Sequence, residues 1–470
     1  MLQNYVSELR VSSKRKRVLG DFAEITSAHG CILATKSQNA FMRALWIIAI
    51  ITAWLVCTYQ IWISVDKYYQ YQTIVTIQIK HLTNVTFPAI TICNLNPIRS
   101  SWLKNNFSKT ILDEIVNTDD INLSVAGHDI NDMLIDCTFQ STKCTSKNFT
   151  RWEHGTYGNC YTFLVTRQEY VGFLGPLYGL SLTLHVEDKE YLIRHSQGSG
   201  FKVEVHPAEY IPFPEDKGFT ISPGILTSVG IKKKRISRMP LPYDGTDCGD
   251  LGDIIRSDSL LYYGALKIAG YNGQVNYTTQ ACMKSCYQKR LIQDCNCVDP
   301  SFVTRDDIYT FYTTNDNKPS ACDMTLQISF ECVRKSLENS TSSGFCEKLC
   351  PQSCYEQDYI PRVTTSLWPR TSYYKRVKDL WKRRFPSLET IREAHEARTN
   401  LAKLEVYYEQ LNYESVVESP SQDVWDLLSS IGGTLGLYVG MSFLTLGEFA
   451  ELFFRCVALP IQDSLQQLSF

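Results

Sequence analysis

The sequence lacks an excess of charge of either sign. Its 470 residues include 47 Lys and Arg against 49 Asp and Glu, which gives a formal net charge of −2. A near-neutral total gives no electrostatic reason to bind nucleic acid or an anionic surface. The sequence also has no repeat of solenoid period and no low-complexity tract. These absences exclude repeat architectures and disfavour a nucleic-acid partner.

Complete catalytic motifs are also missing. His395 and Glu396 begin like the HExxH motif of zinc proteases, but Thr399 stands where the second His ligand is required. The Gly-Ser-Gly segment at 198–200 lacks the GxSxG spacing of a nucleophile elbow, and no phosphate-binding glycine loop follows a predicted strand. We therefore expect neither an enzyme nor a bound cofactor or metal.

Cysteine, by contrast, is abundant, with 17 residues in the chain. This density indicates an oxidising compartment. Fourteen of the cysteines lie between residues 66 and 423, and the other three are Cys31, Cys57 and Cys456. An even number in that interval predicts seven disulfides, although the count leaves their connectivity open.

The cysteine spacing favours helices joined by disulfides. CxxxC spacings at 282/286, 346/350 and 350/354 place the two cysteines of each pair one helical turn apart. Zinc is the alternative, but no His lies between Cys282 and Cys354.

Two long uncharged runs predict two membrane-spanning helices. Residues 44–65 are long enough to cross a hydrocarbon core of about 30 Å, and a signal peptide would be shorter and nearer Met1. The second run, 427–447, carries Gly432, Gly436 and Gly440 on one helical face. Such a face suits helix dimerisation, or an unwound stretch whose carbonyl groups line a water-filled cavity.

The basic residues before the first span predict that residues 1–43 are cytoplasmic. Two spans then return the C-terminus to the cytoplasm and place residues 66–423 outside, as expected for a multi-pass protein of the plasma membrane. Six Asn-x-Ser/Thr glycosylation sequons fall within that outer region, at Asn84, Asn106, Asn122, Asn148, Asn276 and Asn339.

Hydrophobic patterning predicts a mixed α+β outer domain. The expected strands cover 73–81, 85–93, 161–166, 181–185 and 403–414. Helices are expected over 103–116, within a peripheral helical lobe at 100–150, and over 376–398, and turns with Gly and Pro are expected at intervals along 206–245. The basic runs 232–235 and 382–384 are solvated faces or contacts for glycans or acidic peptides.

The second span ends in residues that suit an ion pathway. Gly440, Met441 and Ser442 place a glycine and a hydroxyl where backbone carbonyls can replace the water around a cation. A ring of Glu448 carboxylates from several subunits would concentrate cations at the inner mouth. Glu451 is expected to face a helix interface instead.

Four segments, in this order, resemble the degenerin/epithelial sodium channel family, which includes acid-sensing and neuropeptide-gated channels. Residues 26–30 (TSAHG) resemble its cytoplasmic His-Gly gating motif, with His29 and Gly30, and residues 87–94 (FPAITICN) resemble the segment after its first span. Residues 411–414 (LNYE) and 432–442 (GGTLGLYVGMS) resemble the entrance to its second span and its GxS filter. The resemblance covers nearly the whole chain.

This resemblance implies a trimer of identical or homologous subunits in a lipid bilayer, permeable to Na⁺ in preference to K⁺ and blocked by compounds of the amiloride type. The ectodomain would comprise palm, β-ball, finger, thumb and knuckle. The implied boundaries are palm strands at 66–99 and 403–419, finger 100–160, thumb 282–354, knuckle helix 355–400, second transmembrane helix 424–454 and cytoplasmic C-terminus 455–470.

The resemblance also implies residue roles. It places Ser429 where the family has a small residue at the outer pore and where bulk locks channels open. Ser430 replaces an Asp of acid-sensing members, which leaves outer cation capture to Asp426. The implied disulfides are Cys93–Cys160, Cys137–Cys144, Cys248–Cys354, Cys282–Cys350, Cys286–Cys346, Cys295–Cys332 and Cys297–Cys322.

Departures from acid-sensing members bear on the stimulus. Gln72 and Thr73 replace a His pair, and the helix after Cys332, expected to be short and to begin at Val333, lacks a carboxylate pair. The 27 Tyr residues suit a surface that grips an aromatic, cationic peptide. We therefore predict a sodium channel opened by an extracellular FMRFamide-like neuropeptide.

Two alternatives remain open: a proton-gated or bile-acid-sensitive channel of the same family, and a membrane-anchored, disulfide-rich receptor or adhesion protein. The Gly-rich, carboxylate-ended second span disfavours the adhesion protein, because a passive anchor needs neither feature.

Overall fold

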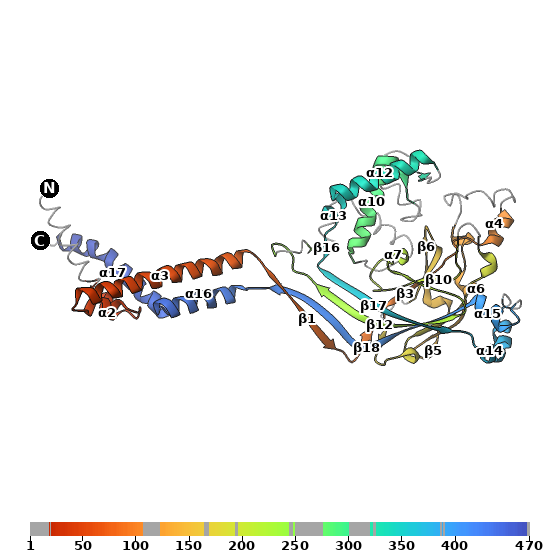
Figure 1. Cartoon of the computed structure of the whole chain (residues 1–470), viewed down its shortest axis with the longest axis horizontal. Helices are drawn as coiled ribbons and strands as arrows, with labels where there is room; N and C mark the ends of the chain where they lie inside the picture. Colours follow the sequence, from red (N-terminus) through yellow and green to blue (C-terminus); the bar gives the residue numbers. More distant parts are fainter. Residues whose placement is uncertain are drawn as a thin grey trace. The chain divides into compact units, whose positions relative to one another are not determined.

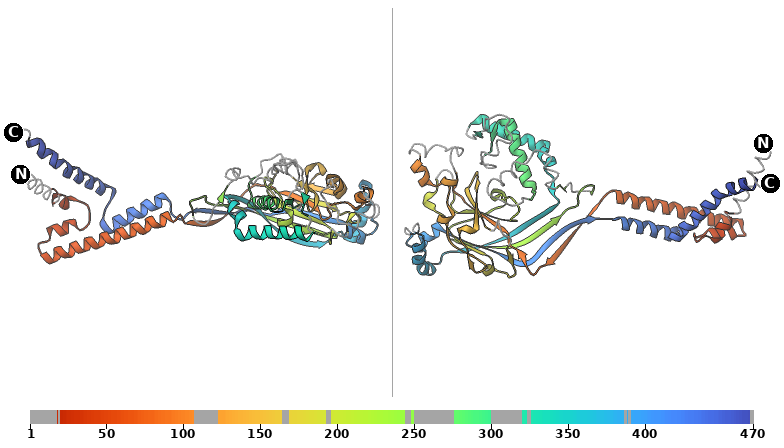
Figure 2. Two further views of the ribbon diagram at one scale, coloured as in Figure 1. Left: turned by 90° about the horizontal axis from the view of Figure 1, so that it is seen from above. Right: turned by 180° about the vertical axis from the view of Figure 1, so that it is seen from behind.

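The computed structural model describes residues 18, 20–106, 123–163, 169–192, 196–243, 248–249, 276–299, 320–322, 326–385, 388 and 391–467 (Figures 1 and 2). The chain divides into two compact units. Unit 1 comprises residues 1–74, 242–245 and 420–470, and unit 2 comprises residues 75–241 and 246–419.

Unit 1 is helical. Its helices are α2 (Cys31–Lys36), α3 (Ala40–Tyr69), α16 (Val424–Val439) and α17 (Phe443–Gln467). Of the helices described, only α3 is by itself long and apolar enough to cross a membrane, whereas α16 and α17 qualify only as one span bent by 72°. Figure 1 and both views of Figure 2 place α16 along α3, where the Ser64 and Ser430 hydroxyls lie 3.1 Å apart. The expected second span is therefore broken in the middle.

Unit 2 is built on two sheets. The first has the order β17-β12-β18-β9-β4-β5, with β1 also paired to β18, and the second has the order β11-β10-β3-β7-β6. The strands of the first are β1 (Thr73–His81), β4 (Leu134–Phe139), β5 (Thr142–Lys143), β9 (Leu180–His185), β12 (Ile225–Ser237), β17 (Tyr355–Leu367) and β18 (Leu401–Pro420). Those of the second are β3 (Ala89–Asn94), β6 (Phe149–His154), β7 (Gly158–Phe163), β10 (Phe201–His206) and β11 (Phe219–Ile221).

The main core lies between these sheets. Alternate residues of β9, Leu180, Leu182 and Leu184, are fully buried and pack in one cluster with Ile90 and Ile92 of β3. Thr183 and His185, which alternate with these leucines, are buried as well, so both faces of β9 are covered. All six residues of β3 are buried because it lies between β10 and β7.

The remaining elements are short or lie at the edges of unit 2. The helices are α4 (Ser100–Asn106), α5 (Leu123–Ala126), α6 (Ile130–Met133), α7 (Pro214–Lys217), α10 (Thr279–Cys295), α12 (Gln327–Ser343), α13 (Phe345–Leu349), α14 (Thr371–Arg384) and α15 (Ala394–Asn400). The short strand pairs are β2 (Val85–Thr86) with β8 (Tyr170–Val171), β13 (Cys248–Gly249) with β16 (Gln352–Ser353), and β14 (Cys297–Val298) with β15 (Ser320–Ala321).

Several expected elements differ in the structure. The expected strand 85–93 is divided into β2 and β3 around Phe87-Pro88, because proline has no N–H for a sheet ladder. The region 206–245 contains the thirteen-residue strand β12 where turns were expected. In the lobe expected to be helical over 100–150, the described helices are α4, α5 and α6, and β4, β5 and β6 follow Met133. The last part of the expected helix 103–116 lies outside the described residues.

The expected knuckle helix over 355–400 is wrong. Residues 355–367 form β17, which pairs along its whole length with β12, and two helices follow, α14 and α15. The single helix expected over 376–398 ends at Arg384 because Phe385 precedes a proline, and its backbone is accordingly extended, with φ −129° and ψ 96°.

The cysteine-rich helices follow the expected spacing only in part. Cys282 and Cys286 lie one turn apart on α10, as predicted. The 350/354 pair is not helical, because α13 ends at Leu349 and Pro351 cannot continue it. The helix around Cys332 is neither short nor begun at Val333: α12 has seventeen residues and includes Cys332.

Seven disulfides join unit 2, and they are the same seven pairs that the resemblance implies: Cys93–Cys160, Cys137–Cys144, Cys248–Cys354, Cys282–Cys350, Cys286–Cys346, Cys295–Cys332 and Cys297–Cys322. Cys31, Cys57 and Cys456 are free thiols.

Candidate functional site

The break between α16 and α17 is built from two opposed helix caps. Gly440 ends α16 in the left-handed conformation, with φ +70°, and its N–H donates to the Gly436 carbonyl at 3.1 Å. The bond from Gly440 to Gly436 is that of the αL C-cap motif, and the Met441 N–H donates in addition to the Leu435 carbonyl at 3.2 Å. The sequence Gly-Met-Ser thus begins with the one residue that adopts this conformation without strain.

Ser442 then starts α17. Its hydroxyl accepts from the Thr445 N–H at 3.3 Å, and its own N–H donates to the Thr445 hydroxyl at 3.0 Å. This reciprocal pair is the hydrogen-bond pattern of an N-terminal capping box. The GxS sequence therefore ends one helix at its glycine and begins the next at its serine. The backbone groups at this break lie outside the regular hydrogen bonds of either helix.

The His-Gly segment lies against this break. The His29 N–H donates to the carbonyl of Val439, the last residue of α16, at 2.9 Å. A Cβ at Gly440 would lie 2.4 Å from Cγ of the His29 ring, so glycine is required there by space as well as by conformation. Gly30 has φ +86° and lies close to Ile50 of α3. The structure thus brings together His29, Gly30 and Gly440, which the sequence separates by about 410 residues.

The residues just before His29 contact the other side of the break. The Thr26 hydroxyl donates to the Glu448 carboxylate at 3.0 Å, and the Ser27 N–H donates to the same oxygen at 3.1 Å. The Ser27 and Thr445 hydroxyls lie 2.6 Å apart. In this protomer the Glu448 carboxylate therefore holds the N-terminal segment. Thr26 and Thr445 are almost fully buried.

These contacts add residues that the sequence argument did not assign a role. Thr26 and Ser27 belong to the quoted TSAHG segment, but their partner Glu448 lies more than 420 positions away, and nothing local indicates the pairing. Glu451, expected at a helix interface, pairs with Arg455 one turn along α17 at 2.5 Å. Both residues line a pocket together with Phe22, Ile25 and Glu448.

The N-terminal end of α16 carries the other predicted pore residues. Asp423 caps the helix by accepting from the Asp426 N–H at 2.7 Å, and the Asp426 carboxylate accepts from the Asp423 N–H at 3.1 Å. Asp426 is thus part of a capping box, where a carboxylate also favours the positive end of the helix dipole. Ser429 is exposed on α16, and its neighbour Ser430 contacts Ser64 of α3.

In unit 2, a group of ion pairs connects α10 through α7 to β6 of the second sheet. The Glu215 carboxylate of α7 accepts from His154 Nε2 of β6 at 2.9 Å and from Lys284 of α10, and Lys284 also pairs with Asp216 at 2.8 Å. Burial opposes ionisation of Glu215, but hydrogen bonds and charges from His154 and Lys284 lower its pKa to about 2. The pairs therefore connect three elements through one short helix.

Glu204, on β10, is a buried carboxylate in the opposite situation. It is 2% exposed, and its Oε2 has no hydrogen-bond partner among the described residues. It lines a small cavity with Lys217, Tyr210 and Asp358. Burial raises the pKa of Glu204 to about 8, so this carboxyl is largely protonated at neutral pH.

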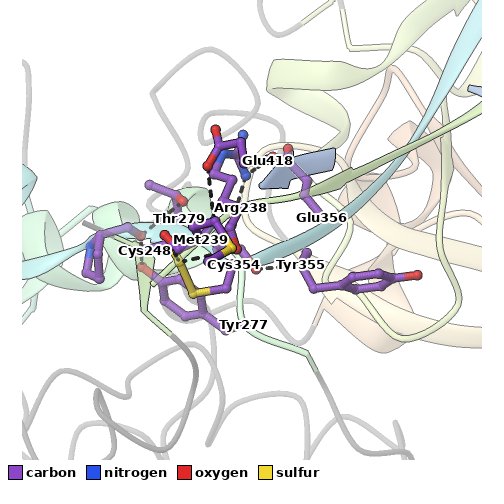
Figure 3. Close-up of a disulfide and its surroundings, with 11 residues drawn as sticks. Arg238, Met239, Cys248, Tyr277, Thr279, Cys354, Tyr355, Glu356 and Glu418 are labelled. Carbon is purple, nitrogen blue, oxygen red and sulfur yellow. Dashed lines mark hydrogen bonds and ion pairs between the residues drawn. A yellow bond between two sulfur atoms is a disulfide. The ribbon is translucent and has the colours of Figure 1, made fainter. Parts of the chain in front are cut away.

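A second connection surrounds the Cys248–Cys354 disulfide (Figure 3). Arg238, just after β12, donates to the Ser353 carbonyl at 2.8 Å and pairs with Glu356 at 2.9 Å. Figure 3 places Glu418 of β18 beside them, where it accepts from the Met239 N–H at 3.0 Å. The ends of three strands of the first sheet therefore meet at one disulfide.

The sequons agree with an exposed location. The five that the structure describes have exposed Asn side chains: Asn84, Asn106, Asn148, Asn276 and Asn339. The sixth, Asn122, lies outside the described residues. No group of three or more His, Cys, Asp or Glu side chains suited to a metal occurs in the part of the chain that the structure describes.

Comparisons with known proteins agree with this architecture. The model of the amiloride-sensitive sodium channel family matches residues 22–119 and 103–452. The FMRFamide-activated amiloride-sensitive sodium channel of Cornu aspersum is 26% identical over 544 residues, covering 94% of this chain and 83% of the relative.

Other relatives are longer proteins. Epithelial sodium channel subunit alpha of Neoceratodus forsteri is 32% identical, covering 71% of this chain, and degenerin unc-8 of Caenorhabditis elegans is 29% identical, covering 69%. The matches cover 47% and 39% of these two relatives. The chain therefore belongs to the amiloride-sensitive sodium channel family, whose members are ion channels and not enzymes.

Proposed function

We propose that this chain is a subunit of a sodium-selective plasma-membrane channel opened by an extracellular FMRFamide-like neuropeptide. The observation that carries the channel function is the interruption of α16 and α17 at residues 440–442. Irregular backbone is tolerated at membrane depth only where it is buried in protein or lines a water-filled cavity. In a trimer, three such breaks would supply carbonyl and Ser442 hydroxyl oxygens to a permeating Na⁺.

The N-terminal segment is proposed to act as the inner gate. His29 contacts the outer side of the break at Val439, and Thr26 contacts the inner side at Glu448. A movement of α16 relative to α17 would have to break these contacts or move the N-terminal segment together with the helices. Glu448 would then alternate between holding the N-terminal segment and facing cations at the inner mouth.

Peptide gating is supported by the likeness to the FMRFamide-activated channel, which extends over 94% of this chain. It is also supported by the absence of titratable side chains at Gln72 and Thr73. We further propose the topology expected above, with both termini cytoplasmic, glycans on the sequons, and block by amiloride-type compounds.

Expression of the full chain under voltage clamp tests the proposal. Amidated peptides of the FMRFamide type should evoke an amiloride-blocked Na⁺ current, and the same peptides with a free C-terminal carboxylate should evoke far less. A current evoked by acid or bile acid alone would favour the alternative of the same family. No cation current under any condition, with the protein at the cell surface, would overturn the channel proposal for a homomer.

Ser429 provides a second test. Replacing it by phenylalanine should give standing, amiloride-sensitive current without peptide, because bulk at the outer pore holds the helices apart. The matched control is Leu428→Phe, since Leu428 is an exposed neighbour on the same helix. A closed Ser429→Phe channel, or standing current in both variants, would contradict the pore assignment.

A further inference from the structure

The two basic runs of unit 2 have different surroundings. In β12 the charges of the 232–235 run are matched: Lys232 lies 4.0 Å from Glu409 and Lys234 lies 3.9 Å from Glu414. Arg235 stacks over a tyrosine ring, and Lys233 is buried, donating to the Thr86 hydroxyl at 3.0 Å. The sheet therefore pairs two of these four charges with carboxylates and places the other two against a ring and a hydroxyl, so less free charge is left for a partner.

The second run belongs to α14, which is attached by one apolar face. Tyr374 and Trp381 are buried in a cluster with Trp368, Ile391 and Leu401. Because these anchors define the inward face of α14, its basic residues lie on the remaining surface. They are Lys375, Arg376, Lys378, Lys382 and Arg383, against the single acid Asp379.

This positive charge has few internal partners. None of Lys375, Arg376 and Lys378 forms an ion pair or side-chain hydrogen bond within the described residues, and Lys375 and Arg376 are exposed. Among the residues that the structure describes, Arg383 donates to the Asp379 backbone carbonyl at 3.1 Å. The helix carries this excess in a chain whose net charge is −2, so it is a local concentration and not a reflection of overall composition.

We propose that the exposed face of α14 binds a sulfated polysaccharide chain outside the cell. Lys375, Lys378 and Lys382 recur at i, i+3 and i+7, which aligns them in a stripe roughly 10 Å long. Arg376 and Arg383, seven residues apart, form a parallel row. A linear polyanion laid along the helix meets both rows, and its sulfate oxygens accept charge-assisted hydrogen bonds from Lys and Arg.

Two other anionic partners fit this surface less well. Anionic lipid is concentrated on the cytoplasmic leaflet, whereas α14 lies outside in the proposed topology, on which this inference depends. An acidic peptide gains much of its affinity from an open strand edge or an apolar groove. The backbone of a helix such as α14 is already hydrogen-bonded internally and offers no strand edge.

The test uses the purified full-length channel and immobilised heparin in salt of about 0.15 M, where exposed charges still interact over roughly 8 Å. The triple variant K375Q/R376Q/K378Q should bind at least about tenfold more weakly than the parent. The triple variant K232Q/K234Q/R235Q removes the same number of Lys and Arg charges from β12, and it should stay within about twofold of the parent.

Competition identifies the partner class. Soluble heparin should compete, uncharged dextran should not, and polyglutamate should compete at least about tenfold less well than heparin. No binding to heparin, equal losses in the two triple variants, or equal competition by polyglutamate would each overturn the proposal. Heparin binding needs no channel current, so its failure is distinguishable from failure of the proposed gating.

Surface expression of both triple variants, measured in the cells from which they are purified, checks that they fold. If the α14 triple variant does not fold, the single exposed substitution Lys375→Gln replaces it, with about a twofold to threefold loss expected. An unchanged affinity in a folded Lys375→Gln channel would then count against the proposal.

Discussion

Different interactions stabilise the interior of unit 1 and the interior of unit 2. Unit 2 has a buried core between two sheets and seven disulfides, so its conformation is fixed by packing and by covalent bonds. Unit 1 exposes much of its apolar surface, including Trp46, Leu55 and Trp62 of α3, and its described helices carry no disulfide. Among its described residues, α16 lies along α3, and the break after α16 is held by hydrogen bonds around Gly440 and Glu448.

The difference indicates where a conformational change is least costly. A disulfide-bonded core transmits displacement without changing its own shape, whereas a helix break held by single hydrogen bonds can adopt a second arrangement. Substitutions in unit 2 should therefore alter stability first, and substitutions in unit 1 should alter current first.

Removing a disulfide should have the largest effect. The double variant C286S/C346S opens a loop of 60 residues between α10 and α13, and loss of a native disulfide typically costs about 2–5 kcal/mol. We expect a lower thermal midpoint of the purified channel and fewer molecules in surface biotinylation. The control is Cys31→Ser, which removes a free thiol and should behave like the parent. Equal stability of the double variant and the control would contradict the contrast between units.

Gly440 provides the opposite test. Gly440→Ala places a Cβ against the His29 ring and forces a left-handed conformation that costs about 1–2 kcal/mol for a non-glycine residue. We expect the peptide-evoked current to fall at least about tenfold with surface expression unchanged. In the control Gly433→Ala, the new methyl group meets open space in this protomer. Normal current in Gly440→Ala would show that the cap geometry is not needed for conduction.

The contact between Thr26 and Glu448 should have an intermediate effect. Thr26→Val and Glu448→Gln should each shift the peptide concentration for half-maximal current by about threefold, because each weakens the same hydrogen bond. The double variant should shift it by little more than either single variant. Fully additive shifts in a double-mutant cycle would mean that the two side chains do not interact during gating.

Glu204, which is buried, and Glu215, which is partly buried, predict the smallest effect, a change in how stability depends on pH. The pKa of Glu204 is raised to about 8 from an ordinary 4.5, so its contribution is fully present below pH 4.5 and is lost as the pH rises through 8. The pKa of Glu215 is lowered to about 2, so its contribution is present above 4.5 and lost as the pH falls through 2.

Thermal midpoints of the purified channel at pH 5 and pH 8 separate these two carboxylates. In the parent, the thermal midpoint should be lower at pH 8 than at pH 5. Glu204→Gln should make this difference in midpoint smaller by about 2 °C or more. Glu215→Gln should leave that difference unchanged, although it lowers the midpoint at both pH values by breaking the pairs with His154 and Lys284. A pH dependence that Glu204→Gln does not alter would mean that this carboxyl is already ionised at pH 5.

Much of the architecture could be predicted from the sequence because it rests on local signals. The uncharged run that became α3 and the alternation that became β1 and β9 are properties of short segments. The Gly-Met-Ser stop and start signal is also local, since left-handed backbone needs glycine and an N-cap needs a hydroxyl. The expected helix over 355–400 failed because β17 is a strand only by virtue of its pairing with β12.

The sequence by itself determined two apolar runs, a region between them with an even number of cysteines, and the glycines of the second run. Only the tertiary structure decided that Thr26 meets Glu448, that the basic run of β12 meets Glu409 and Glu414, and that Lys375, Arg376 and Lys378 of α14 form no ion pair among the described residues. The physical reason is distance along the chain. A sequence does not show whether a charged group or a hydroxyl has a hydrogen-bond or ion-pair partner. Sheet register and helix packing bring such partners within bonding distance.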